Sequence, residues 1–404
     1  MNQTQKQLVK MLSSAVRKEQ VTFNLDESID WEALIEEAKE HKVSGLAYSA
    51  IKNNIGQLHI DDTLLNEWKR DVIFSSMHQS KHVKQVSELL QVFNDHEIPV
   101  IILKGMVLRN LFPNPDLRTM SDVDVLVHEE DLGRIEDMLT AMNFTKVEDP
   151  QEKHDVYYKP GGIKIEVHWS LTEDGMFKGG KAYEEGIWER TREVEVLGVK
   201  TLTLGYNDFI FHLIIHMASH VAYHGFGVRY LVDLVVMIEQ QGQLIDWQEV
   251  IRLIDLCQIR KFSAVIFGCC EDLFGLKLPK EVAQLATVDP NYLTLFEDEV
   301  MNSGVHGYRE SSEVLSRQIS YNNQKQLSPL QKMINLFFPA IDEMSDKYHY
   351  AKKNKILAPI AWIHHLFVGL FHPTYSFKDK VKLMTSGYQT VKKRADMIEW
   401  LELE

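Results

Sequence analysis

Ser121-Asp122-Val123-Asp124-Val125-Leu126-Val127 is the stretch of sequence that decides the fold. Apolar residues alternate with two aspartates, which is the pattern of a strand with one buried face. The aspartates are at positions i and i+2, so both carboxylates point to the same side of that strand. Two close negative charges repel each other unless a cation lies between them. Because carboxylate oxygens suit Mg²⁺ or Mn²⁺, the stretch predicts a divalent-metal site on a strand.

A third acid follows downstream, in Lys164-Ile165-Glu166-Val167-His168. The apolar residues of this predicted strand occupy one face and Glu166 the other. The strand comes after the turn Pro160-Gly161-Gly162, which would fold it back as a hairpin. We expect it to lie beside the strand that carries Asp122 and Asp124. Three carboxylates could then hold two metal ions.

A strand-to-helix turn precedes the acids. Val100-Ile101-Ile102-Leu103 reads as a strand buried on both faces, and Lys104-Gly105 ends it. A glycine there lets the backbone approach a phosphate, and the helix N-terminus supplies N–H donors. Lys104 would add a point charge and Arg118 a forked donor. The predicted nucleotide-binding residues are therefore Lys104, Gly105, Arg118 and Ser121. An Asp-x-Asp pair alone is common on solvent-facing strand edges, and this turn favours a nucleotide site instead.

The order of elements predicts an α+β protein. Further strand signals lie at 144–147, 156–159 and 163–168, and helical patterns separate the earlier strands, which indicates a small mixed sheet flanked by helices. Helical periodicity covers the chain before His96 and after Asn207. We therefore expect a helical N-terminal region at 1–96, a mixed core at 97–205 and a helical C-terminal domain at 206–404.

Charge and length narrow the classes of partner. The 404 residues are 45% hydrophobic, as in an ordinary globular protein, and the formal net charge is −14. Such a charge disfavours nucleic acid as an obligatory partner, and the lysine clusters near residues 352 and 392 are typical of solvated helix faces. A small molecule or a peptide is the favoured acceptor class.

The cysteines and the apolar segments indicate a cytoplasmic protein. The three cysteines show no metal-type spacing and no disulfide framework, which is typical of a reducing compartment. Residues 1–18 lack the apolar core of a signal peptide. The most apolar stretch, 356–371, is shorter than the roughly 20 residues that span a bilayer. It predicts a buried core helix and no transmembrane segment.

The motifs resemble a known family. Leu103-Lys104-Gly105-Met106, then the run from Leu117 to Val127, then Ile165-Glu166-Val167-His168-Trp169 are similar to the uncharacterised nucleotidyltransferase family of the polymerase-β-like superfamily. The likeness extends to His216-x-x-x-His220 and Arg229-Tyr230-Leu231-Val232-Asp233. It implies a nucleotidyltransferase core, with Asp122, Asp124 and Glu166 as metal ligands and Gly105 in the nucleotide-binding turn. Many members of the superfamily have Gly-Ser at this turn, whereas this chain has Lys104-Gly105-Met106.

Histidines recur every four residues downstream, at His212, His216, His220 and His224, along one stripe of a predicted helix. Three interpretations stay open: a polar face that lines the cleft, ordinary structural histidines, and a zinc site, which would need a further ligand from elsewhere. Because the resemblance includes this region, substrate or phosphate contact is predicted for a set of residues beside the acids. They are His168, His216, His220, Arg229 and Asp233.

These features together predict a metal-dependent nucleotidyltransferase that uses Mg²⁺ or Mn²⁺ and takes a nucleoside triphosphate as co-substrate. Asp122, Asp124 and Glu166 are the predicted catalytic residues. The resemblance also implies a tailoring enzyme, since relatives of this type accompany natural-product gene clusters such as those of lasso peptides. The open alternatives are a kinase-like phosphoryl or glycosyl-type transferase, a toxin- or antitoxin-type nucleotidyltransferase, and a non-catalytic nucleotide-binding module.

Overall fold

The computed structural model describes most of the chain in two compact units, each of which is described by itself. The described residues are 1–23, 28–147, 154–172, 176–223, 225–285, 287–304, 331, 334–335, 338–370, 392 and 395–403. The first unit comprises Met1–Met217 and Gly227–Met301, and the second comprises Ala218–Phe226 and Asn302–Glu404. All the described strands lie in the first unit.

A mixed sheet of seven strands forms the centre of the first unit, in the order β3-β4-β5-β2-β1-β7-β6. The strands are β1 (Ile101–Ile102), β2 (Asp122–Leu126), β3 (Thr145–Val147), β4 (His154–Tyr158), β5 (Lys164–His168), β6 (Thr191–Val196) and β7 (Val199–Leu204). β2 pairs with β5 in parallel and with β1 in antiparallel orientation, and β1 pairs with β7 in parallel. The α+β class and the mixed sheet expected from the sequence are confirmed.

The hairpin of β6 and β7 was absent from the sequence-based prediction. Its pairing runs from Thr191 opposite Leu204 to Val196 opposite Val199. The turn between the strands is Leu197-Gly198, and both residues have positive φ, 46° and 84°. A two-residue turn of this kind matches the right-handed twist of the strands. The alternation of apolar and polar residues on both sides of Leu197-Gly198 is the signal that would have identified the hairpin.

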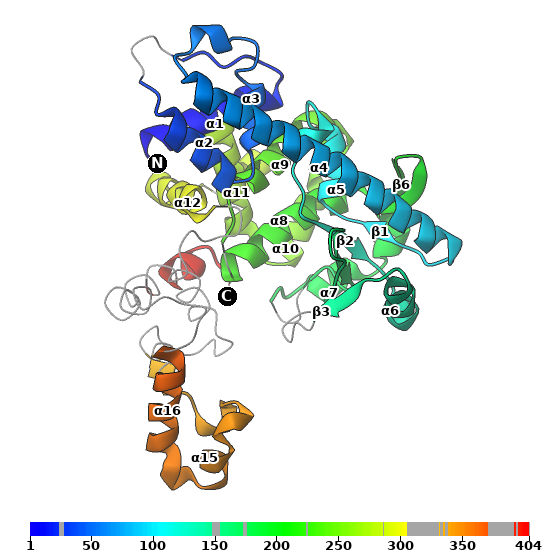
Figure 1. The fold of residues 1–404 in the computed structure, drawn as a ribbon, viewed down its shortest axis with the longest axis vertical. Coiled ribbons are helices and arrows are strands. Elements are labelled where there is room, and N and C mark those ends of the chain that lie inside the picture. The colour runs from blue at the N-terminus through cyan, green and yellow to red at the C-terminus, as the bar shows by residue number, and fades with distance from the viewer. Residues whose placement is uncertain are drawn as a thin grey trace. The chain divides into compact units, whose positions relative to one another are not determined.

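The N-terminal helices are α1 (Gln3–Val16), α2 (Trp31–Glu40), α3 (Ser44–Ser49) and α4 (Asp62–Asp95). Each long helix begins at a side chain that caps its free N–H groups: Asn2 for α1, Asp30 for α2 and Asp61 for α4. Figure 1 shows α4 running from the cluster of α1, α2 and α3 along the sheet, where it packs against β6 and β7. α4 thus ties the N-terminal helices to the sheet.

Further helices follow β1 along the chain. They are α5 (Gly105–Leu108), α6 (Leu132–Ala141), α7 (Gly180–Glu184), α8 (Tyr206–Tyr223), α9 (Val228–Gln241), α10 (Trp247–Leu256), α11 (Arg260–Phe274) and α12 (Pro290–Ser303). Short 3₁₀ turns occupy Ile55–Gln57, Arg109–Leu111, Pro115–Leu117, Glu129–Asp131, Ile187–Arg190, Gly242–Leu244 and Val282–Gln284. α9 and α11 are buried on most of their surface and form the core of the helical part together with α1, against which both pack.

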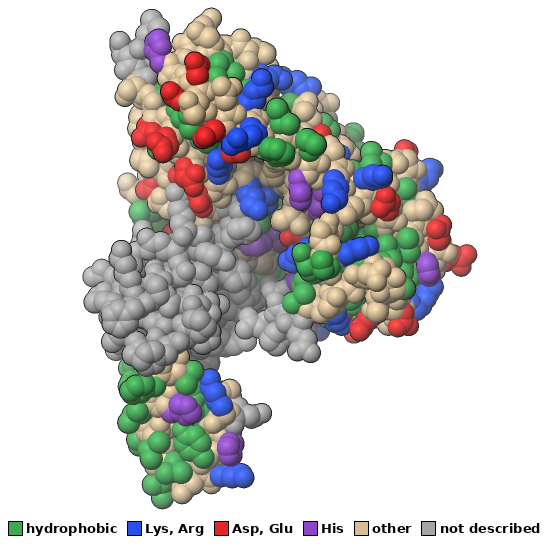
Figure 2. Space-filling model, in the orientation of Figure 1, with side chains coloured by type: hydrophobic (Ala, Val, Ile, Leu, Met, Phe, Trp, Pro, Cys, Tyr) green, Lys and Arg blue, Asp and Glu red, His purple; other side chains and the backbone are tan. Residues whose placement is uncertain are grey.

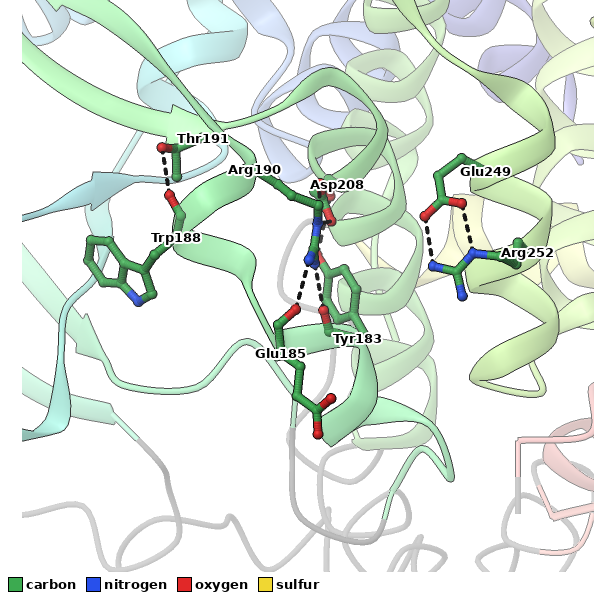
Figure 3. A network of polar contacts seen from close by, with 8 residues as sticks. All are labelled: Tyr183, Glu185, Trp188, Arg190, Thr191, Asp208, Glu249 and Arg252. Carbon is green, nitrogen blue, oxygen red and sulfur yellow. Dashed lines mark hydrogen bonds and ion pairs between the residues drawn. The ribbon is translucent and has the colours of Figure 1, made fainter.

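Arg190 fixes the junction between β7 and α8 (Figure 3). Its Nε donates to both carboxylate oxygens of Asp208, at 3.2 Å each, and its terminal nitrogens donate to the backbone oxygens of Glu185 and Tyr183 at 2.7 Å. The N–H of Gly205 donates to the Arg190 backbone oxygen, and a Cβ at Gly205 would lie 2.7 Å from that oxygen. This network sets the direction in which α8 leaves the sheet.

The described part of the second unit contains α15 (His349–Lys353), α16 (Ala358–Leu370) and 3₁₀ turns at Ile341–Glu343, Asp346–Tyr348 and Lys355–Leu357. The prediction of a buried helix at 356–371 is wrong for one side of α16. Ile360, Ile363 and Phe367 are between 56% and 60% exposed, and hydrophobic side chains gather over α16 in Figure 2. Ala361 of α16 belongs to the buried cluster of this unit, and Ala358 and Trp362 pack against that cluster while partly buried. Within the described residues, no helix has the length and apolarity to cross a membrane.

Glu297 on α12 is a buried acid in the helical part of the first unit. Glu297 is only 4% exposed, and Asp272 on α11 lies beside it. Burial, and then the negative charge of Asp272, raise the pKa of Glu297 from 4.5 to about 8. The folded protein therefore holds a proton on Glu297 that the unfolded chain releases between those two pH values.

We expect Glu297→Gln to change the pH dependence of stability. The stability that wild type derives from protonated Glu297 is complete below pH 4.5 and is lost as the pH rises toward about 8. Glutamine stays neutral, so the variant should match wild type near the lower value and unfold at a higher temperature above the upper one. Calorimetry across this range measures the difference. Glu271→Gln, an exposed change on α11, is the control, and parallel curves for Glu297→Gln and wild type would contradict the prediction.

Candidate active site

The register between β2 and β5 brings the predicted acids together. In this parallel pair Asp124 lies opposite Glu166, Asp122 opposite Lys164, and Leu126 opposite His168. The intervening valines and Ile165 are buried on the other face of the sheet. Since side chains alternate along a strand, both aspartates, Glu166 and His168 lie on one face. The expectation that the third acid's strand would lie beside the first is confirmed.

Three of these side chains lie at metal-ligand spacing. One oxygen of Asp124, one oxygen of Glu166 and one ring nitrogen of His168 are within 4.8 Å of one another, the only such group of three or more potential ligands in the part of the chain that the structure describes. Asp122 shares the face but does not join this group. The structure thus replaces Asp122 by His168 in the closest set of ligands, whereas the sequence predicted three carboxylates.

His168 provides the test of whether a cation fits. Its Nε2 lies 3.4 Å from Oδ1 of Asp124 and 3.8 Å from Oε2 of Glu166. This nitrogen is buried, and among the described residues it has no hydrogen-bond partner. A buried polar atom without a partner is rare and points to an ion or a water. Two carboxylates and an imidazole that converge in this way suit a divalent cation.

Lys104 lies at the end of β1 with an unusual backbone. Its φ is 43° and its ψ −109°, a region that residues with a Cβ rarely adopt. Its Nζ donates to Oδ1 of Asp124 at 3.0 Å and lies 2.7 Å from Nε2 of His216. An ammonium can only donate, so Nε2 of His216 is the acceptor of this contact. The surrounding contacts hold the strained backbone, and the strain places the ammonium beside the acid.

A second lysine faces the same acids, and the sequence-based prediction did not include it. Lys164 is two residues before Glu166 on β5 and forms an ion pair with it. Burial alone would raise the pKa of Asp124, but Lys104 and His168 outweigh it and hold that pKa well below its usual value. Burial likewise opposes His168 and Lys164 at Glu166, whose pKa falls to about 2. Both acids are therefore ionised at neutral pH.

Asp122 behaves differently from the other two acids. Burial, and then the charges of Asp124 and Glu166, raise the pKa of Asp122. The two lysines oppose this shift without overcoming it. The face therefore carries three carboxylates of unlike environment, of which only Asp124 and Glu166 have an ammonium in direct contact.

Arg118 is engaged with Asp233 on α9. Its Nε donates to Oδ1 at 3.0 Å and its Nη2 to Oδ2 at 2.7 Å, and both side chains are at most 8% exposed. This bidentate pair takes up the fork that the sequence suggested for phosphate. A Cβ on Gly105 would lie 2.4 Å from Nη1 of Arg118, so the glycine makes room for the guanidinium. In the structure Arg118 therefore holds Asp233, and Gly105 leaves space for the guanidinium.

The loop that leads into β2 is held by three neighbouring elements. The Gln79 side chain on α4 accepts from the backbone N–H of Met120 and donates to its backbone oxygen. Thr119 donates to the backbone oxygen of Lys42, and Arg229 on α9 donates to the backbone oxygen of Thr119. Arg229 thus contacts this loop. The loop position, and with it the start of β2, depends on α4, on Lys42 after α2 and on α9.

A small cavity adjoins this arrangement. It has a volume of about 20 Å³, enough for roughly one water molecule. The residues that line it are Lys104, Arg118, Leu213, His216, Met217, Tyr230 and Asp233. Its polar lining consists mainly of groups that the sequence assigned to nucleotide or phosphate contact. The cavity itself is too small to hold a nucleotide.

The remaining predicted residues have varied positions. Ser121 is exposed immediately before β2. His220 belongs to the second unit, which is described separately, and His224 lies outside the described residues. His212 is 3% exposed, and neither ring nitrogen has a hydrogen-bond partner among the described residues. Neither it nor His216 joins a group with metal-ligand spacing there, so the described geometry does not support zinc binding by this pair.

His154 on β4 is a neighbour of the site that the sequence-based prediction missed. It lies opposite His168 in the β4–β5 register, and the two ring centroids are 4.6 Å apart. Burial, and then the proximity of His168, lower the pKa of His154 to about 4. Counting outward from the turn Pro160-Gly161-Gly162 would have identified the pair, because hairpin register follows from the turn.

With this geometry established, comparison with known families identifies the chain. The model of a family described as uncharacterised nucleotidyltransferase matches residues 27–275, more than half of the chain. The chain belongs to this family. The match covers the sheet, the acids, Lys104, the Arg118–Asp233 pair and the helices that hold the loop before β2. The nucleotidyltransferase resemblance of the sequence motifs is confirmed.

Further comparisons add two remote structural neighbours. The antibiotic-resistance factor ANT(2″)-Ia is 12% identical, with a TM-score of 0.33, and the match covers 45% of this chain and 93% of that one. An antigenic nucleotidyltransferase-like protein from Paracoccidioides brasiliensis is 16% identical, with a TM-score of 0.32, over 51% and 98% of the two chains. At such scores the likeness carries nothing over to this family member. No curated protein matches the chain significantly.

We expect Gly105→Ala to disrupt the Arg118–Asp233 pair. The added Cβ would meet Nη1 of Arg118, and the buried guanidinium cannot move away without weakening its contact with Asp233. The free energy of unfolding, measured by urea denaturation, should fall by about 1–3 kcal/mol. Gly133→Ala on α6 is the control, since a Cβ there meets nothing within 4 Å. Equal effects of the two changes would contradict the steric argument.

Proposed function

We propose that this family member is a metal-dependent nucleotidyltransferase that moves a nucleoside monophosphate from a nucleoside triphosphate to a small-molecule, peptide or protein acceptor. The observation that carries the proposal is the convergence of Asp124, Glu166 and His168 within 4.8 Å, beside the ammonium of Lys104 at the end of β1. This arrangement offers cation ligands and a positive charge on one face of a sheet. Phosphoryl transfer needs little more from a protein than positioning and neutralisation of charge.

The residues divide into ligands and phosphate-binding groups. Asp124, Glu166 and His168, with Asp122 on the same face, would hold Mg²⁺ or Mn²⁺, which supplies neutralisation of the phosphate charge when it is bound. Lys104 would exchange part of its contact with Asp124 for a phosphate oxygen. Ser121, exposed at the start of β2, is close enough in sequence to these acids to contact the same phosphates. His216 would keep the Lys104 ammonium in place.

The reaction balances with groups on this face. An acceptor hydroxyl or phosphate gives its proton to Asp124 or Glu166 and, from there, to water. The acceptor oxygen forms a bond to the α-phosphorus in line with the bond to the bridging oxygen, which breaks, and pyrophosphate leaves. Arg118 and Asp233 act indirectly, because their buried ion pair holds the loop before β2 against α9. Their part is to maintain the geometry in which the reacting atoms meet.

The acceptor class follows from charge. The chain has a formal net charge of −14, and on the face drawn in Figure 2 Lys and Arg side chains are interspersed with Asp and Glu among the described residues. Such a surface does not attract a long polyanion. We therefore favour a small molecule or a peptide, in the manner of a natural-product tailoring enzyme. The three cysteines are free and buried, which supports a reducing, cytoplasmic setting.

Labelled triphosphates test the reaction class. We expect an acceptor fraction from a cell extract to gain label from α-labelled and not from γ-labelled triphosphate in the presence of Mg²⁺ or Mn²⁺. Asp124→Asn should reduce the transfer at least about 100-fold, because the residue is both a ligand and the partner of Lys104. Lys81→Gln is the control, since its amine donates to the backbone oxygen of Gly161 in the β4–β5 turn.

Each alternative has its own outcome. Transfer from γ alone would replace the proposal by a kinase-like reaction, and label from a nucleotide-linked sugar would indicate a glycosyl-type transfer. Label on cellular RNA, or on a cellular target whose modification inhibits growth, would indicate a toxin-type nucleotidyltransferase. No transfer at all, with unchanged triphosphate affinity in Asp124→Asn, would leave a binding module.

A further inference from the structure

We propose that Nε2 of His168 is a direct metal ligand and that this nitrogen makes the site prefer Mn²⁺ to Mg²⁺. The inference deepens the proposed function, since it concerns the same face of the sheet, but it is a statement about metal binding without nucleotide. The carboxylates alone would suit either cation. The imidazole changes the balance, because nitrogen ligands favour first-row transition ions over Mg²⁺.

Nε2 of His168 is shared between the two acids. It lies 3.4 Å from one oxygen of Asp124 and 3.8 Å from one oxygen of Glu166, and it makes a well-aligned hydrogen bond of ordinary length with neither. If His168 only oriented one acid, its N–H would lie at ordinary hydrogen-bond distance and angle from that acid. Instead the nitrogen and the two oxygens surround one point, as ligands of a shared ion do.

Strand pairing on both sides fixes the position of His168. His168 ends β5, where it pairs with Leu126 of β2 on one side and with His154 of β4 on the other. Its backbone oxygen accepts from the N–H of Val127 at 2.9 Å. The His154 ring, with its centroid 4.6 Å away, limits the other side of the imidazole. The ligand therefore comes from the interior of a sheet and not from a loop, which favours a fixed coordination geometry.

The charges around the site also favour Mn²⁺ over Mg²⁺. Mg²⁺ binds through charge and oxygen ligands and gives up its water reluctantly. Here Lys104 contacts Asp124 and Lys164 contacts Glu166, so two of the three carboxylates on this face already have an ammonium partner. The attraction that Mg²⁺ depends on is correspondingly reduced. A bond to neutral imidazole does not depend on that net charge, and Mn²⁺ gains more from it than Mg²⁺ does.

The test uses the metal-free full-length protein and Mn²⁺ alone. Electron spin-echo spectroscopy of bound Mn²⁺ detects a nitrogen that is bonded directly to the ion. We expect wild type to show the coupling of one such nitrogen, and the coupling should change when the protein is prepared with ¹⁵N-labelled histidine. The isotope experiment needs no substitution, so it does not depend on the folding of any variant.

Two variants assign the nitrogen. His168→Asp replaces the imidazole with a carboxylate ligand and should retain bound Mn²⁺ while losing the nitrogen coupling. His154→Gln removes the neighbouring ring and should retain the coupling. Absence of a directly bonded histidine nitrogen in wild type, or its persistence in His168→Asp, would overturn the assignment.

Competition between the two cations tests the preference. Wild type should bind Mn²⁺ more tightly than Mg²⁺ by about tenfold or more, the scale on which changes around a metal alter its affinity. His168→Asp should bring the two affinities closer together, and equal affinities in wild type would overturn the preference. These measurements contain no triphosphate. Nitrogen-coupled Mn²⁺ without label transfer would therefore refute the proposed function alone, and label transfer without the coupling would refute only this inference.

Discussion

The parallel register of β2 and β5 is the constraint on which the candidate site depends. It sets Asp124 opposite Glu166 and leaves His168 one step further on the same face. A slip of one residue would turn Glu166 and His168 to the opposite face and bring buried Ile165 and Val167 to this one. The apolar residues of both strands prevent such a slip, because their burial requires the observed register. Packing on one face of the sheet therefore fixes the chemistry on the other.

β1 extends the same constraint to Lys104. The N–H of Leu103 donates to the backbone oxygen of Asp124, so the end of β1 is tied to the residue that the lysine contacts. The positive φ of Lys104 then turns its side chain back toward the acids. Strained backbone persists only where the surroundings determine it strongly, and it is concentrated at functional sites. The contacts of Lys104 with Asp124 and His216 are such surroundings.

The site also depends on the pairing of buried charges. Asp124, Glu166 and Asp233 each form an ion pair within a largely buried region, with Lys104, Lys164 and Arg118 respectively. A buried charge without a partner is strongly destabilising, so these pairs have to form in the absence of substrate. The ammonium groups of Lys104 and Lys164 also offset the repulsion between Asp124 and Glu166 when no metal is bound. A bound cation would therefore act on a site that is already assembled.

Local patterns were sufficient to predict part of this site. The alternation in Ser121–Val127 and in Lys164–His168 predicted both strands, their acids and their neighbourhood, since strand periodicity is a property of a few adjacent residues. The pairing of Arg118 with Asp233 could not be predicted in this way, because 115 residues separate the two. The same holds for the contact of Lys104 with His216. The sequence-based prediction assigned nucleotide or phosphate contacts to all four residues, but which of them pair with each other depends on how α8 and α9 pack.

The exchange of Asp122 for His168 in the closest ligand set has a similar origin. Alternation places Asp122, Asp124, Glu166 and His168 on one face but does not say which of them converge. Convergence depends on side-chain length and on the offset along two paired strands. Asp122 lies opposite Lys164, on the side of the Lys104-Gly105 turn, whereas His168 is one step beyond Glu166 in the opposite direction. The longer imidazole side chain spans that step, and its Nε2 lies 3.4 Å from Asp124 and 3.8 Å from Glu166.

The helices around the sheet belong to this arrangement as much as the strands do. Gln79 of α4 holds Met120, Asp233 of α9 holds Arg118, and His216 of α8 contacts Lys104. α4 precedes the sheet in the sequence, and α8 and α9 follow it, yet all three contacts lie in the first compact unit. The family match from 27 to 275 spans the same helices. The sheet supplies the acids, and the helices determine where the residues beside them can lie.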